Sequence, residues 1–274
     1  MPEIFVSTSC LSGMRDLGEI LKIYSAHGIR NVELSGGLDY VDNVEGILRM
    51  YPHLNFIIHN YFPPVREPFI MNLAAQDELI RERSVTVCEK AIDLCLRFDC
   101  RLYSFHPGFR VEKTLDLNFE IHGKDLVSYD AAFGKFTRSI EDVLVYAKSR
   151  GVKIALENLE HKNEAYMMTR PEEFAHFQEI FPEVGVLLDL GHLKIASTRL
   201  GFKVNDFLRT VQDNVREVHI HENDGEKDLH REPKNGEVMS LLERVDCGTV
   251  VLECRNLNME QIIHNLLALE QVCI

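Results

Sequence analysis

The chain has 274 residues, of which 45% are hydrophobic, and a formal net charge of −13 at pH 7. This length suits one barrel of about 250 residues or two small domains, and it is enough to bury a sizeable core. The acidic balance argues against a generally basic, nucleic-acid-coating surface, and the lack of any run of about 18 apolar residues argues against a membrane span.

Short apolar runs alternate with longer stretches of helical periodicity along the whole chain. The apolar runs predict eight strands, in chain order Ile4–Ser9, Asn31–Ser35, Leu54–His59, Arg101–His106, Lys153–Glu157, Val184–Asp189, Glu217–His221 and Thr249–Glu253. The helical stretches include Asp16–Ala26, Gln76–Leu96, Ala131–Ser149, Pro171–Phe181 and Met259–Gln271. Eight apolar strands alternating with helices predict a parallel sheet covered by helices, and eight units predict closure into a (β/α)8 barrel.

The expected helix ends agree with this division. Gly28 and Gly151 follow helical segments, where a left-handed C-terminal cap is expected. Thr169 and Glu172 flank Arg170 and Pro171, and this spacing predicts a capping box with proline in the first turn.

The seven cysteines predict a reducing compartment. Their number is odd, no C-x-x-C pair is present, and Cys88, Cys95 and Cys254 lie inside apolar stretches. Buried, reduced thiols are therefore expected. The N-terminal residues lack a basic region followed by an apolar one, so we expect no signal peptide and a soluble, cytoplasmic protein.

Metal-ligand residue types end six of the eight predicted strands. These residues are His59, His106, Glu157, Asp189, His221 and Glu253, and His192 follows three residues after Asp189. In a closed barrel these ends converge on the face where such enzymes place their active sites. Carboxylates crowded together repel one another, so this cluster predicts bound cations, and imidazole with carboxylate suits Zn²⁺, Mn²⁺, Co²⁺ or Fe²⁺.

The segment after the seventh strand extends this set. His219 and His221 are two residues apart and share a face of the strand, and we favour His221 as the ligand because it is at the rim. His219 is expected to pack in a layer below or to support a ligand. Asp228 and His230 form a D-x-H pair that could reach back to a further metal ion.

The other histidines are expected to have surface or capping roles, because they fall in helices or loops away from the predicted rim. These are His27, His53, His122, His161, His176 and His264. His161 is the closest of them to a predicted ligand, since it follows Glu157 by four residues.

Several short motifs resemble those of the xylose-isomerase-like barrel superfamily, which includes endonuclease IV and many sugar isomerases and epimerases. The matching segments are Phe105-His106-Pro107-Gly108, Leu156-Glu157-Asn158, Leu188-Asp189-Leu190-Gly191-His192, His221-Glu222-Asn223-Asp224-Gly225, Asp228-Leu229-His230, Leu252-Glu253 and Asn72-Leu73-Ala74. Their order and spacing cover nearly the whole chain, so the resemblance implies one barrel domain over residues 1–274.

The resemblance also implies a ligand set. The superfamily shares a core around one metal ion, carried here by Glu157, Asp189, His221 and Glu253. Endonuclease IV adds further ligands, which correspond here to His59, His106, His192, Asp228 and His230. All nine positions are filled, so one to three divalent ions are expected, with zinc favoured and manganese, cobalt or iron left open.

Two loops favour a sugar over DNA. Residues 36–42 after the second strand are short and acidic, a poor match to the DNA-reading loop of the endonuclease, and Glu33 is the kind of residue that sugar-binding relatives present there. Residues 60–69 are rich in proline and aromatic side chains, which suits a lid over a small polar ligand or, equally, a rigid surface loop.

The leading hypothesis is a metal-dependent isomerase or epimerase of a sugar or sugar phosphate. In it the metal stabilises an enediolate, and Glu157 and Glu253 exchange a proton as base and acid. His192 would bind a substrate oxygen or a second metal, while Arg231 or Arg255 would hold a phosphate or hydroxyl.

Two alternatives stay open. The first is endonuclease IV-like zinc-dependent hydrolysis of abasic DNA by the full nine-ligand set. The second is a metal-stabilised barrel that binds a sugar or protein without catalysis. A membrane partner is not expected, and a homo-oligomer is left open.

Overall fold

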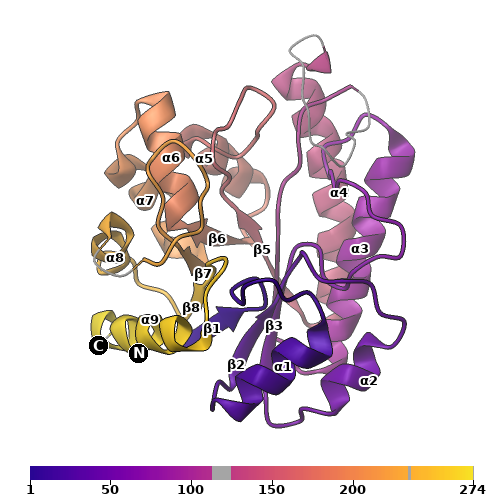
Figure 1. Cartoon of the computed structure of the whole chain (residues 1–274). Coiled ribbons are helices and arrows are strands. Elements are labelled where there is room, and N and C mark those ends of the chain that lie inside the picture. The colour runs from indigo at the N-terminus through magenta and orange to yellow at the C-terminus, as the bar shows by residue number, and fades with distance from the viewer. Residues whose placement is uncertain (113–124, 234–235, 274) are drawn as a thin grey trace.

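Eight parallel strands form a closed barrel in the order β1 to β8 in the computed structural model, which describes residues 1–112, 125–233 and 236–273 (Figure 1). The strands are β1 Glu3–Ser7, β2 Asn31–Leu34, β3 Asn55–His59, β4 Leu102–Phe105, β5 Lys153–Glu157, β6 Gly185–Asp189, β7 Val215–Ile220 and β8 Thr249–Leu252. All eight predicted strands are present, with bounds shifted by at most two residues. The predicted (β/α)8 barrel is therefore confirmed.

Helices surround the barrel on its outside (Figure 1). They are α1 Leu17–Ala26, α2 Val44–Arg49, α3 Glu78–Arg97, α4 Tyr129–Arg150, α5 Pro171–Ile180, α6 Leu190–Leu200, α7 Val204–Val211, α8 Glu237–Leu242 and α9 Met259–Val272. The five helices named from the sequence are confirmed. None of the described helices is long and apolar enough to cross a membrane.

Helix caps explain several of these boundaries. Gly28 and Gly151 have positive φ angles of 81° and 69°, as expected of residues that end a helix in the left-handed region. The predicted capping box at Thr169 and Glu172 is wrong by one residue. Glu173, not Glu172, accepts hydrogen bonds from the backbone N–H groups of Thr169 and Arg170. The reason is that α5 begins at Pro171, so Glu173 is its third residue, and that side chain reaches back to the residues before the helix.

The barrel interior changes from apolar to polar along its axis. Its apolar part consists of two clusters, Phe5 with Ile57 and Val251, and Leu102 with Ala155 and Leu187. Apolar side chains of this kind fill the inside of a small barrel, so the interior is a packed core and not a pore. The inward-facing residues nearer the carboxyl ends of the strands are polar, which places the candidate site at that end.

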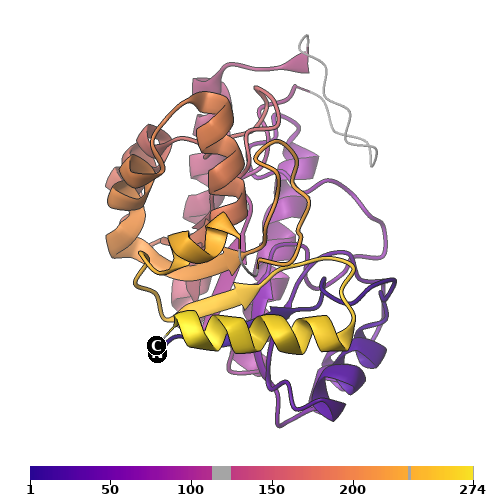
Figure 2. The ribbon, with the colours of Figure 1, turned by 60° about the vertical axis from the view of Figure 1, so that its left-hand side comes forward.

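The helix α9 closes the outside of the barrel beside β1 and brings the two ends of the chain together. In two views, the N- and C-termini lie next to each other at one end of α9 (Figures 1 and 2). Asn258 caps α9 by accepting from Gln261 N, and the Gln261 side chain accepts from Asn258 N in return.

Candidate metal centre

The nine predicted ligands meet at the carboxyl end of the barrel. Contacts of 4.0 Å or less between nitrogen and oxygen atoms join them into one network, with no member left aside. The strand-end pattern and the family resemblance together therefore predicted which side chains would come together. That they bind metal stays a prediction.

Glu157 is the centre of the inner part of the network. Its Oε2 lies 2.7 Å from His106 Nε2 and 3.3 Å from His59 Nε2, and its Oε1 lies 3.0 Å from His192 Nδ1. Glu157 ends β5, while His59 ends β3 and His106 follows β4, so three consecutive strands supply this group. A carboxylate with imidazoles beside both oxygens would hold a divalent ion together with them.

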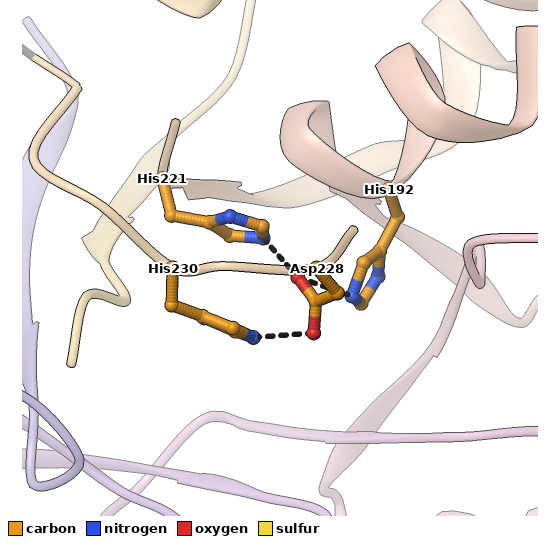
Figure 3. A group of neighbouring side chains, drawn as sticks. All are labelled: His192, His221, Asp228 and His230. Carbon is orange, nitrogen blue, oxygen red and sulfur yellow. Dashed lines mark hydrogen bonds and ion pairs between the residues drawn. The ribbon is translucent and has the colours of Figure 1, made fainter. Parts of the chain in front are cut away.

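An outer group lies beside it, made of three imidazoles around one carboxylate (Figure 3). Asp228 Oδ2 is 2.8 Å from His230 Nε2, and Asp228 Oδ1 is 3.7 Å from His221 Nε2 and 3.8 Å from His192 Nε2. One atom from each of the four residues lies within 4.8 Å of the others. This spacing fits the ligand shell of a single ion.

The short connection between β6 and α6 sets the position of two ligands. Asp189 ends β6 and caps α6, its Oδ1 accepting from His192 N over 2.6 Å, so that His192 lies in the first turn of the helix. Gly191 leaves room for the His221 ring, because a Cβ atom there would lie only 2.2 Å from His221 Cε1. The Asp-Leu-Gly-His segment thus positions ligands from two strands.

Hydrogen bonds fix the direction of the imidazole rings. His192 Nδ1 donates to Asn158 O over 3.0 Å, and His230 Nδ1 donates to Glu253 O over 2.7 Å. His59 Nδ1 is hydrogen-bonded to Ser104 Oγ at 3.0 Å. In all three rings Nε2 is left to face carboxylates, which is the arrangement that supporting partners create for metal-binding histidines.

Charges within the network shift the pKa values of its members strongly. Burial alone would lower the pKa of His192, but Asp189, Asp228 and Glu157 raise it well above its ordinary value. Burial alone would raise the pKa of Asp228, but His192 and His230 hold it far below its usual range. Burial dominates at His59 and lowers its pKa to about 4. The charged form of each of these groups is thus stabilised by its neighbours of opposite charge.

The residues fit a divalent metal ion. Glu157 Oε2, His221 Nδ1 and Asp228 Oδ1 are buried yet make no hydrogen bond within residues 1–112, 125–233 and 236–273. Buried polar atoms of this kind are costly unless a partner satisfies them. A donor set of imidazole nitrogens and carboxylate oxygens suits Zn²⁺ and its neighbours in the first transition series.

A cavity of about 550 Å³ opens onto this network. Glu157, His192, Asp228, His230 and Glu253 contribute to its polar side. Its other walls carry large apolar and aromatic side chains, namely Met14, Leu38, Tyr61, Phe69, Ile70, Phe109, Leu159 and Tyr166.

The segment expected to form a lid contributes to this cavity. Tyr61 and Phe69 both line it, and the loop folds back on itself because Met71 N donates to Tyr61 Oη over 2.9 Å. Arg83 lies over the Phe69 ring at 4.2 Å from its centroid. The loop thus forms part of the cavity wall, which is consistent with the predicted lid.

The three predicted substrate-binding residues lie in different places. Arg255 lines the cavity, whereas Arg231 is exposed and pairs through its backbone with Glu222 outside the cavity lining. Glu33 is fully buried behind the metal centre and hydrogen-bonded to His219. In this structure only Arg255 of the three is placed to meet a ligand in the cavity.

Glu160 is a site residue that the sequence pattern did not single out. It lines the cavity, and its Oε2 lies 3.7 Å from His192 Nε2. Burial raises the pKa of Glu160. Its position three residues after Glu157, beyond the end of β5, could have indicated a place in the site. A loop carboxylate is, however, more often a turn or surface residue.

Apart from His219, which contacts Glu253, the other described histidines that make polar contacts have their partners outside the nine-residue network. His161 contacts Glu164 at 3.6 Å, and His176 contacts Glu179 at 3.8 Å. His27 donates through Nδ1 to Ile23 O at the end of α1. His122 is outside the described residues.

Comparison with known proteins places the fold. The family model described as xylose isomerase-like TIM barrel matches residues 22–271. The uncharacterized protein MJ1614 of Methanocaldococcus jannaschii is 26% identical over 228 residues, which cover 82% of this chain and 79% of that protein. A crystal structure of a D-tagatose 3-epimerase-like protein aligns with a TM-score of 0.75 and 18% identity, covering 99% of this chain and 97% of that one. The 3-keto-D-glucoside 4-epimerase YcjR from E. coli aligns with a TM-score of 0.69 and 14% identity, covering 99% of both chains.

Proposed function

Because the chain belongs to the xylose isomerase-like TIM-barrel family, we propose that it is a divalent-metal-dependent isomerase or epimerase of a sugar or sugar phosphate. The observation that carries this proposal is the placement of Glu157 and Glu253, which both line one cavity beside the candidate metal ligands. The sugar epimerases with the same fold support the substrate class.

The cavity suits a small ligand better than a DNA duplex. Its volume of about 550 Å³ is in the range of small-molecule sites. Arg255 is the one Lys or Arg side chain among the described residues that line it. A DNA site needs several basic or backbone donors for phosphates, whereas the aromatic rings of Tyr61 and Phe69 offer flat faces for a sugar ring.

The residues of the chain would share the chemistry as follows. Glu157 and Glu253 would act on the carbon next to the carbonyl of the sugar, one removing its proton and the other returning a proton. A bound divalent ion, held by the carboxylates and imidazoles of the network, would supply Lewis-acid stabilisation of the negative charge that develops on the substrate oxygens. Arg255 would hold a hydroxyl or phosphate group, and the lid residues would exclude water.

The test combines metal analysis with proton exchange. Purified protein loaded with Zn²⁺, Mn²⁺ or Co²⁺ is incubated in D₂O with a panel of ketoses, aldoses and their phosphates, and NMR detects deuterium at the exchanged carbon. Glu157→Gln should lower exchange at least about 100-fold, and Glu164→Gln, an exposed residue outside the cavity lining, should not. Full exchange by Glu157→Gln would contradict the proposal.

The outer group favours a second candidate, phosphodiester hydrolysis of abasic DNA by a three-metal cluster. His192, Asp228 and His230 add a further ion site. It lies beside the one that Asp189, His221 and Glu253 would form. Two or three ions can stabilise both the attacking and the leaving oxygen of a displacement. Three Zn²⁺ per chain together with cleavage of an abasic duplex would establish this activity, and no cleavage by the three-zinc protein would exclude it.

A further inference from the structure

His219, a buried imidazole, lies beneath the candidate metal centre. It is on β7 two residues before His221, so both side chains face the barrel interior. His219 is fully buried and is not among the residues that line the cavity. Any effect it has on a reaction in the cavity must therefore pass through other residues.

Glu33 holds one edge of this ring. His219 Nε2 donates to Glu33 Oε2 over 2.7 Å. Glu33 is on β2, and the strands β8 and β1 separate β2 from β7 in the sheet, so the hydrogen bond crosses the inside of the barrel. Glu33 is itself fully buried and does not line the cavity. Among the described side chains, the Glu33 carboxylate is hydrogen-bonded to the His219 imidazole. Because Glu33 does not line the cavity, it is not placed to contact a sugar there.

The opposite edge of the ring faces predicted metal ligands. His219 Nδ1 lies 3.3 Å from Glu253 Oε2 and 4.0 Å from Asp189 Oδ2. The centroid of the His219 ring is 4.8 Å from that of His59, with the two rings in an edge-to-face arrangement. One imidazole thus touches ligands from β3, β6 and β8.

This arrangement is costly for folding alone. Glu33 Oε1 and His219 Nδ1 are buried without a hydrogen bond to any described residue, and burying polar groups unsatisfied costs free energy. The adjacent interior is filled by Phe5, Ile57 and Val251, which avoid that cost. Glu33 and His219 stand where apolar side chains could pack at a lower cost in free energy. Their presence therefore points to a role in the metal centre directly above them.

We propose that Glu33 and His219 are positioning residues that fix the Glu253 carboxylate of the metal centre. The inference rests on the proposed function, in which Glu253 is a metal ligand and exchanges a proton with the substrate. Glu33 holds the ring through Nε2, so that Nδ1 stays against Glu253 Oε2 and restricts its rotamers. Supporting partners of this kind usually change metal affinity or activity by about 10–100-fold when they are removed.

The experiment measures Co²⁺ binding to the whole protein, because the visible absorption of bound Co²⁺ reports the geometry of its ligands. Glu33→Gln keeps the size of the side chain and removes its charge. His219→Asn keeps an amide near the position of Nδ1, and His219→Gln keeps one near Nε2. Each variant with wild-type circular dichroism should bind Co²⁺ about 10–100-fold more weakly and show a changed visible spectrum. The Glu33→Gln/His219→Asn double variant should be no weaker than the weaker single variant, because the pair acts as one unit.

Glu217→Gln is the matched control. Glu217 is also buried on β7, and its Oε1 is 3.5 Å from His219 Nε2, on the side away from Glu253. Because Glu217 is farther from His219 Nε2 than Glu33 is, its variant should change the Co²⁺ affinity and spectrum less than Glu33→Gln does. Wild-type binding by folded Glu33→Gln, or an equal change in Glu217→Gln, would overturn the positioning role and leave the proposed function intact. Absence of Co²⁺ binding by the wild-type protein would instead overturn the proposed function itself.

Discussion

Asp228 is the residue on which the outer group depends. It is the only carboxylate among the four residues of that group, and it contacts the Nε2 atoms of His192, His221 and His230 (Figure 3). Removal of its charge would leave three imidazoles facing one another. Two of them, His192 and His230, owe their raised pKa values in part to this carboxylate.

We therefore expect Asp228→Asn to lose about one metal ion per chain, because a neutral amide oxygen is a weaker ligand than a carboxylate. The inner ligands Glu157 and Asp189 are unchanged, so their ion should be retained. Metal content after dialysis, measured by mass spectrometry, checks this. Asp224→Asn is the control, since Asp224 is exposed on the same loop and accepts hydrogen bonds from the backbone of Glu226 and Lys227. Wild-type metal content in Asp228→Asn would contradict the assignment.

The segment between β6 and α6 shows how an element positions ligands through packing alone. A Cβ atom on Gly191 would lie 2.2 Å from His221 Cε1 and 2.6 Å from both ring nitrogens. No rotamer change on Gly191 can relieve this overlap, because a Cβ atom is fixed by the backbone. The ring of His221 or the start of α6 would have to move.

Gly191→Ala should therefore destabilise the protein by about 1–3 kcal/mol, the usual cost of overpacking, and weaken metal binding. Urea denaturation of both proteins measures the first effect, and Co²⁺ titration the second. In the control Gly134→Ala, the added Cβ in α4 would meet nothing within 4 Å, so a gain of about 0.5–1 kcal/mol is expected from helix propensity. Equal stability of Gly191→Ala and wild type would show that the site adapts freely.

Two loops at the rim are joined by Asn72. Its Nδ2 donates to Phe109 O over 2.9 Å, and its Oδ1 accepts from Phe109 N and Ala74 N over 2.9 and 3.0 Å. Gly108 allows this approach, because a Cβ there would lie 2.2 Å from Asn72 Oδ1 and its φ of 109° disfavours other residues. The connection holds the chain that follows the lid segment against the loop that follows β4.

Asn72→Ala should cost about 2–3 kcal/mol in the free energy of unfolding, since three buried hydrogen bonds contribute roughly 1 kcal/mol each. It should also raise KM for the proposed sugar substrate more than it lowers kcat, because Phe109 lines the cavity without being placed in the chemistry. Thermal unfolding and steady-state kinetics give the two readouts. An unchanged KM in a destabilised variant would mean that the rim keeps its shape without this connection.

The sequence was informative where a local pattern determines structure. The apolar strands follow from periodicity, so the barrel and the meeting of the six ligands that end its strands were predictable. The full set of nine ligands was implied by the family resemblance. The helix α6 was not named, because it begins directly after Asp189, the last residue of β6, with no loop between them. The contact of Glu33 with His219 joins residues 186 positions apart. It depends on barrel closure and on side-chain rotamers, which a linear pattern does not contain.

At the scale of the whole molecule, the network makes the free energy of unfolding depend on pH, because the pKa values of some of its groups are raised and those of others are lowered. Carboxylates raise the pKa values of His192, His219 and His230, while imidazoles lower those of Asp228 and Glu253. A raised histidine contributes stability that is complete below its ordinary pKa of 6.5 and is lost as the pH rises through its folded value. A lowered carboxylate contributes stability above its ordinary pKa and loses it as the pH falls through its folded value.

The metal-free protein should therefore lose stability as the pH rises from about 6.5 toward about 8.5. The metal-loaded protein should behave in the opposite way over the upper range, because a bound cation replaces the protons on the imidazoles and metal affinity grows as they deprotonate. At a free Zn²⁺ concentration of about 100 times Kd, each ion would add about 2.7 kcal/mol. Melting temperatures from pH 5 to 8.5, measured with EDTA and with Zn²⁺, should diverge as the pH rises. Parallel curves would mean that the network holds no metal and is a set of internal ion pairs.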